Sequence, residues 1–208
     1  MDPALGCAEI HALLPTLPAL HSPADVDFSN GLYFFYEAGE SSAHAPDGRV
    51  VRIGNHPHAR DGLVARLNNH YRGGKNGSVF RRQLGGALLR RDNPATACLA
   101  PGPGQGHWDH QDDRPCPACR STESAVTDLL KASFYFRCVR VDNQSLRNRL
   151  ESRLIASVAA CEVCRPSATW LGRYAYPALV RSSGLWNTQH IGGPAATSRD
   201  LELFAQLV

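Results

Sequence analysis

Lysine is scarce in this chain, and the features of several protein classes are missing. Of its 22 basic residues only Lys75 and Lys131 are lysine, so the other 20 are arginine. No apolar run approaches the roughly 20 residues that a helix needs to cross a bilayer. The N-terminus also lacks the basic segment that opens a secretory signal. We therefore expect a cytoplasmic protein without a membrane partner.

The composition that remains is that of a globular domain. The chain has 208 residues, of which 43% are hydrophobic and 20% are charged. These values exclude a wholly disordered chain and predict about one domain with a hydrophobic core. The net charge of +3 says little about partners. The excess of arginine favours a phosphate ligand, because arginine binds phosphate in a bidentate manner, but codon bias in a GC-rich genome explains it equally well.

The pattern of hydrophobic residues predicts the order strand, strand, helix, helix, strand, helix, which is an α+β fold. Strands are expected over residues 31–36, 49–54 and 133–141. The main helices are expected over 61–71, 79–89 and 143–160, and shorter ones over 7–14, 123–131 and 201–204.

Proline and glycine divide the chain further. Residues 1–27 hold four prolines and are predicted to form an N-terminal arm, so that the main domain covers residues 28–208. Within that domain, residues 92–120 alternate proline with glycine and predict an irregular insertion. Residues 162–208 are rich in loop-forming residues and are predicted to form a C-terminal extension.

Two short motifs mark the first two predicted strands. Gly31-Leu32-Tyr33 opens the first strand, and Arg52-Ile53-Gly54 closes the second. Arg66 and His70 follow on the first main helix, where a spacing of four places both side chains on one face. Each motif alone is common and has an ordinary structural explanation, so only their order is informative.

The order continues with Glu151 on the long helix and with Asn187 after Trp186 in the tail. Taken together, the series from residue 31 to residue 187 resembles the GIY-YIG nuclease superfamily. The resemblance implies a small three-stranded antiparallel sheet flanked by helices, and metal-dependent hydrolysis of DNA phosphodiester bonds. One departure is Arg52, which stands where the second motif of the family usually carries a tyrosine.

The resemblance also implies roles for the matched residues. Glu151 would bind Mg²⁺ or Mn²⁺, since one carboxylate with water and substrate oxygens suits such an ion. Tyr33 would take a proton from water, which a phenol does only where nearby cations stabilise its phenolate. Arg52, Arg66 and the metal would supply that charge, and Arg66 would hold the phosphate. His70 would orient Tyr33 or the phosphate, or shuttle a proton, and Asn187 matches the terminal asparagine of the family.

Other functions stay open at this point. A catalytically inactive module that binds nucleic acid would keep the same fold, and a zinc-stabilised interaction protein would need no DNA. A single active site cuts one strand per encounter, so cleavage of duplex DNA would suggest a homodimer or two encounters. His44, His56 and His58 flank the second strand; a surface loop is the favoured interpretation, and a histidine-based nuclease is the alternative.

A basic segment favours a nucleic-acid partner. Residues 60–91 contain eight basic residues and one acidic residue, and eight minus one gives a local charge of +7. Such a segment would bind the phosphate backbone through salt-dependent contacts. The candidates for these contacts are Arg72, Lys75, Arg81 and Arg82. The competing interpretation is a solvated face of arginine side chains.

Seven cysteines in a chain without an expected secretory signal predict buried thiols or metal ligands rather than disulfides. Cys116 with Cys119 and Cys161 with Cys164 form two C-x-x-C pairs, which together could bind zinc. His107 and His110 offer a more local set with Cys116 and Cys119. We favour an interpretation without zinc, in which Cys116 and Cys119 lie in a flexible loop and Cys161 and Cys164 only end the long helix. Zinc binding is the less favoured alternative. Cys7, Cys98 and Cys138 are expected to be isolated thiols.

Overall fold

The computed structural model describes residues 3–56, 62–99, 108–109 and 116–208 of the chain. It contains a three-stranded antiparallel sheet with helices on both of its faces, so the predicted α+β fold is confirmed. The strands are β1 (Gly31–Glu37), β2 (Val50–Asn55) and β3 (Phe134–Arg140), and β1 lies in the centre between β2 and β3.

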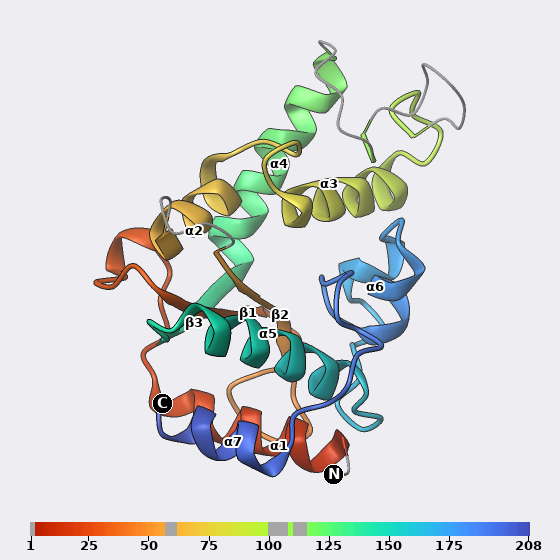
Figure 1. The fold of residues 1–208 in the computed structure, drawn as a ribbon. Coiled ribbons are helices and arrows are strands. Elements are labelled where there is room, and N and C mark those ends of the chain that lie inside the picture. The colour runs from red at the N-terminus through yellow and green to blue at the C-terminus, as the bar shows by residue number, and fades with distance from the viewer. Residues whose placement is uncertain (1–2, 57–61, 100–107, 110–115) are drawn as a thin grey trace.

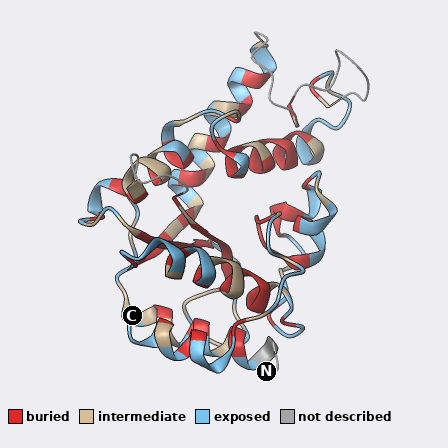
Figure 2. Cartoon of the chain, viewed as in Figure 1, coloured by how far each residue is buried: buried red, intermediate tan, exposed pale blue. Residues whose placement is uncertain are grey.

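Strand β1 explains why helices cover both sides of so small a sheet. Its side chains alternate between the two faces, and both sets are buried. Tyr33 and Phe35 face one hydrophobic cluster, while Leu32, Phe34 and Tyr36 face the other. A strand that is apolar on both faces requires a helical layer on each, as the burial colours show (Figure 2).

The first layer consists of α2 (Gly62–Arg72), α3 (Val79–Asp92) and α4 (Pro117–Ser133). On the opposite face lies α5 (Gln144–Ala159), with α1 (Pro3–Leu13) and α7 (Ser198–Ala205) packed beyond it (Figure 1). Helix α6 (Ala178–Ser183) and three short 3₁₀ helices complete the elements of the described chain. No helix of the described residues is both long and apolar enough to cross a membrane.

Side-chain caps fix the starts of three helices. The side chains of Ser78 and Asn143 accept hydrogen bonds from backbone N–H groups in the first turns of α3 and α5. Cys116 caps α4 in the same manner, and Pro117 occupies its first turn. Helix α4 therefore begins inside the predicted insertion, six residues before the expected start at residue 123.

The outer edges of β2 and β3 form backbone hydrogen bonds with residues that are not in strands. Leu20 exchanges two backbone hydrogen bonds with Phe136 of β3, at 2.8 and 2.9 Å. On the other side, the backbone N–H of Trp186 donates to the carbonyl of Val51 in β2 at 2.7 Å. The segments at both ends of the domain thus lie along the sheet.

The division into an N-terminal arm, a main domain, an insertion and a C-terminal extension remains a prediction. Helix α1 of the expected arm packs against α5 and α7, with Cys7 and Ile10 in the hydrophobic cluster that it shares with them. About half of the expected insertion, residues 100–107 and 110–115, lies outside the described residues. In the extension, Thr197 and Asp200 form a capping box at the start of α7.

Candidate active site

A cleft lies where β2 ends, next to α2 and α5. Among the residues predicted for the site, Tyr33, Arg52, Arg66, Glu151 and Asn187 all line this cleft. They come from β1, β2, α2, α5 and the C-terminal extension. His70, the remaining one, lies behind Tyr33 and is completely buried. The structure therefore brings side chains that are up to 154 positions apart (187 minus 33) to one place.

Tyr33 heads a short chain of hydrogen bonds. Its hydroxyl lies 2.9 Å from Nε2 of His70, and Nδ1 of His70 lies 2.8 Å from the hydroxyl of Ser78. Ser78 also accepts from the backbone N–H of Arg81, which fixes the position of the hydroxyl oxygen at the start of α3. The ring of Tyr33 is thus held from behind, and its orientation depends on His70.

The protonation state of His70 follows from its surroundings. Burial lowers the pKa of His70 well below its usual value, and the positive charges of Arg52, Arg66 and Arg81 lower it further. At neutral pH the imidazole is therefore uncharged and has one donor and one acceptor nitrogen. It either donates to the oxygen of Tyr33 or accepts the hydroxyl proton, while Ser78 takes the complementary role.

Glu151 brings a carboxylate to the cleft from α5. Its Oε1 accepts a hydrogen bond from the backbone N–H of Asn55 at 3.0 Å. Burial raises the pKa of Glu151, while the hydrogen bond from Asn55 and the charges of His190, Arg52 and Arg66 act in the opposite direction. A carboxylate oxygen is a ligand that a hard divalent ion prefers, and the amide side chains of Asn55 and Asn148 line the same cleft.

Arg52 of β2 lies next to a β-bulge and on the same face of the sheet as Tyr33. Phe35 pairs with Arg52 and Tyr36 pairs with Val50, so Val51 is an extra residue on β2. The guanidinium of Arg52 lies 5.0 Å from the ring centre of Phe80 and donates to the carbonyl of Trp186. This places a fixed positive charge on the same side of the sheet as Tyr33.

Two further residues complete the lining. Arg66 of α2 donates to the carbonyl of Gly77 at 3.4 Å and is only partly buried. Asn187 clamps β2, since its Nδ2 donates to the carbonyl of Ile53 at 2.8 Å and its Oδ1 accepts from the N–H of Ile53 at 3.1 Å. Because both ends of the Asn187 amide are engaged, this side chain positions the tail against the strand.

Gly54 allows the ring of Tyr33 to lie across β2. The two residues are direct partners in the sheet, and a Cβ atom on Gly54 would lie 2.3 Å from the hydroxyl oxygen of Tyr33. That is far inside van der Waals contact, so any other residue at position 54 would displace the phenol. The second motif therefore ends in glycine because a side chain at position 54 would occupy the space of the Tyr33 hydroxyl.

The predicted nucleic-acid residues fall into two groups. Arg72 is exposed and Arg82 is partly exposed. Arg81, by contrast, is buried, and its guanidinium is engaged by the Glu123 carboxylate at 2.8 Å, by Thr127 and by the His70 carbonyl. Lys75 is buried too, with its ammonium group 5.9 Å from the ring centre of Trp108. For Arg81 and Lys75 the structure therefore indicates structural roles in place of the predicted contacts.

The two C-x-x-C pairs are not brought together. Cys116 and Cys119 lie at the start of α4, where the sulfur of Cys98 is 3.5 Å from that of Cys116 and 3.7 Å from that of Cys119. Cys161 and Cys164 follow α5 and belong to a different hydrophobic cluster, at the other end of the molecule (Figure 1). The zinc quartet of these four cysteines is thus wrong.

The structure joins none of the seven cysteines in a disulfide. Cys98, however, was expected to be isolated and instead lies beside Cys116 and Cys119. The alternative ligands His107 and His110, and also His58, lie outside the described residues.

Several lining residues were not predicted. They come from the end of β2, from one turn of α5 before Glu151, and from the tail after Asn187; they are Asn55, Asn148, Thr188, Gln189 and His190. His190 has a φ of 66°, which is uncommon for a residue with a side chain. One feature of the sequence could have indicated these residues, namely their position. Each lies close to a predicted residue in the same strand, helix or tail.

Comparison with known families agrees with this geometry. The family model for the GIY-YIG domain matches residues 17–208. The chain therefore belongs to the GIY-YIG family, whose members are generally endonucleases that use a divalent metal, and this supports nuclease activity. No curated protein and no solved structure matches the chain.

Proposed function

We propose that the protein is a metal-dependent endonuclease that hydrolyses phosphodiester bonds in DNA. The observation that carries this proposal is the shared cleft, in which the Tyr33 phenol, two guanidinium groups and the Glu151 carboxylate face one space. Phosphodiester hydrolysis needs an activated water molecule and positive charge near the phosphoryl oxygens. The donors and charges of the cleft match these needs.

Each residue then has a defined task. Glu151 would hold one Mg²⁺ or Mn²⁺ ion, which when bound would neutralise charge on the phosphate. Tyr33, as its phenolate, would accept the proton of the attacking water and so become the phenol, and His70 fixes the ring in the orientation that this requires. Arg66 and Arg52 bind the phosphoryl oxygens. Asn187 keeps the tail in place and so closes one wall of the cleft.

The route of DNA to the cleft would pass the exposed basic residues. Arg72 and Arg82 flank α2 and α3 and are available for phosphate contacts. Cleavage of duplex DNA would need two encounters or a homodimer, as each chain offers one such cleft among the described residues.

The direct test is a titration of divalent metal with single-stranded and double-stranded DNA. We expect cleavage in Mg²⁺ or Mn²⁺ and none in EDTA, and binding that weakens steeply with added salt. Salt-sensitive binding without cleavage at any metal concentration would contradict the enzyme and favour a nucleic-acid-binding module. Absence of binding at low salt would contradict both.

The substitution Gly54→Ala tests the placement of Tyr33. The new Cβ atom would meet the Tyr33 hydroxyl at 2.3 Å and shift it, so we expect cleavage to slow by about 10- to 100-fold. Gly192→Ala is the matched control, because a Cβ atom there meets nothing within 4 Å. Rates of cleavage and melting temperatures of both variants make the comparison; equal rates for Gly54→Ala and wild type would show that the phenol position is unimportant.

A further inference from the structure

A second group of chemically reactive side chains lies on the opposite side of the sheet from Tyr33. Cys7 and His11 come from α1, His44 from the loop between β1 and β2, and Cys161 and Cys164 from the segment after α5. The three cysteines are buried, with exposed fractions of 0%, 2% and 4%. Three segments far apart in the sequence thus place three sulfur atoms and two imidazoles in one apolar region.

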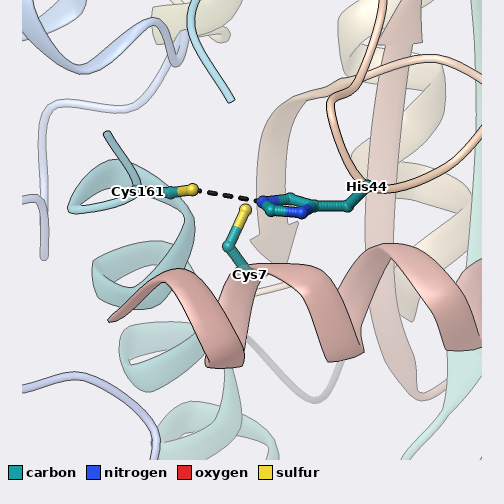
Figure 3. Close-up of side chains that lie close together, drawn as sticks. All are labelled: Cys7, His44 and Cys161. Atoms are coloured by element: carbon teal, nitrogen blue, oxygen red, sulfur yellow. Dashed lines mark hydrogen bonds between the residues drawn. The ribbon is translucent and has the colours of Figure 1, made fainter. Parts of the chain in front are cut away.

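The sulfur of Cys7 is the centre of this group. It lies within 4.8 Å of a ring nitrogen of His44 and of the Cys161 sulfur, and within 4.8 Å of the Cys164 sulfur. Nε2 of His44 is 3.3 Å from the sulfur of Cys161. Figure 3 shows the side chains of Cys7, His44 and Cys161 pointing toward one another from α1, the loop and the end of α5.

His11 has a different role, because both of its ring nitrogens are engaged. Nε2 accepts a hydrogen bond from the backbone N–H of Val50 at 3.1 Å, which requires the lone pair on that nitrogen. Nδ1 therefore carries the proton and donates to the carbonyl of Cys7 at 2.9 Å. His11 thus braces α1 against β2 and leaves four side chains with potential ligand atoms.

We propose that Cys7, His44, Cys161 and Cys164 bind one structural zinc ion. Three thiolates and one imidazole make a tetrahedral set that zinc commonly takes. With the usual zinc–ligand distances, neighbouring ligand atoms in such a site lie about 3.5–3.8 Å apart, close to the 3.3 Å between His44 and Cys161. The spacing Cys161-x-x-Cys164 is that of paired zinc ligands, and Cys7 and His44 supply the two that the sequence alone did not reveal.

Zinc explains this group better than a disulfide does. Three sulfur atoms leave one thiol over if two of them are joined, and a disulfide gives no role to the imidazole of His44. A zinc ion uses all four side chains and ties α1 and the loop before β2 to the end of α5. Because α5 also carries Glu151, the ion would stiffen the helix that forms one wall of the cleft.

The test is the zinc content of the purified full-length protein, measured by plasma mass spectrometry. We expect Cys161→Ser to hold one zinc ion per chain fewer than wild type. Cys138→Ser is the matched control, since Cys138 is buried in β3 and belongs to neither sulfur cluster, and it should retain the wild-type content. Any metal at Cys98, Cys116 and Cys119 is common to all three proteins and cancels in the difference. Equal zinc in Cys161→Ser and wild type would overturn the proposal.

A second pair of variants covers the case in which Cys161→Ser fails to fold. His44→Cys keeps four ligands and should retain the zinc ion, whereas His44→Ala should lose tight binding. Replacement of zinc by Co²⁺ adds an optical readout, because thiolate–cobalt absorption should be present in wild type and His44→Cys and weakened in His44→Ala. Zinc content and cobalt spectra that are the same in all three would overturn the proposal, as would a disulfide among these cysteines in the mass of the unreduced protein.

Discussion

Replacement of Tyr33 by phenylalanine is expected to slow DNA cleavage by about 10²- to 10⁴-fold, the usual contribution of a positioned proton acceptor. The substitution removes only the hydroxyl that lies 2.9 Å from Nε2 of His70 at the cleft. The ring still fills its place between β2 and α2, so DNA affinity should change little, while loss of the hydrogen bond to the buried His70 should lower the melting temperature without unfolding the protein. Single-turnover cleavage rates at saturating Mg²⁺ measure the effect.

Tyr71→Phe is the matched control for this experiment. Tyr71 is buried in the same hydrophobic cluster, and its hydroxyl has no hydrogen-bond partner among the described residues. Loss of that hydroxyl should leave the cleavage rate unchanged. If Tyr33→Phe and Tyr71→Phe both cleave as fast as wild type, Tyr33 does not take part in proton transfer.

Substitution of Glu151 by glutamine should remove metal-dependent cleavage. Glutamine keeps the shape and can still accept the hydrogen bond from Asn55, but it lacks the charge that would hold a divalent ion. A bound metal contributes several kcal/mol of charge stabilisation, so we expect a loss of at least about 100-fold at moderate Mg²⁺. A metal titration of the cleavage rate is the measurement.

Glu202→Gln serves as the control for charge, because Glu202 is an exposed carboxylate on α7. The Glu202→Gln variant should show the same dependence of the cleavage rate on Mg²⁺ concentration as wild type. The same midpoint of the Mg²⁺ titration for Glu151→Gln and wild type would remove Glu151 from the metal site, while leaving the zinc proposal for Cys7 and its neighbours untouched.

The sequence predicted the elements well where local physics decides them. The aromatic run of β1, the alternation of residues in β3 and the capping side chain of Ser78 depend only on neighbours in the chain. The convergence of Tyr33 and Glu151 on one cleft could be expected from the order of the motifs, because that order is typical of a family. These predictions needed no knowledge of long-range packing.

The errors and omissions arise where tertiary contacts decide. Nothing in the series of arginines distinguishes the buried Arg81 from the exposed Arg72, since the difference is made by Glu123, 42 positions later. The grouping of Cys7 with Cys161 depends on the packing of α1 against α5. The position of Arg52 on the same face of the sheet as Tyr33 likewise depends on the pairing of β2 with β1.

The partners of the two outer strands limit how copies of this chain can associate. Leu20 occupies the free side of β3, and Trp186 with the Asn187 amide occupies that of β2. Some of the backbone groups that would otherwise template the addition of a further strand, those of Phe136, Val51 and Ile53, are therefore already used. This guards a very small sheet against intermolecular strand pairing and aggregation. A homodimer, if one forms on duplex DNA, has to use helical or loop surfaces instead.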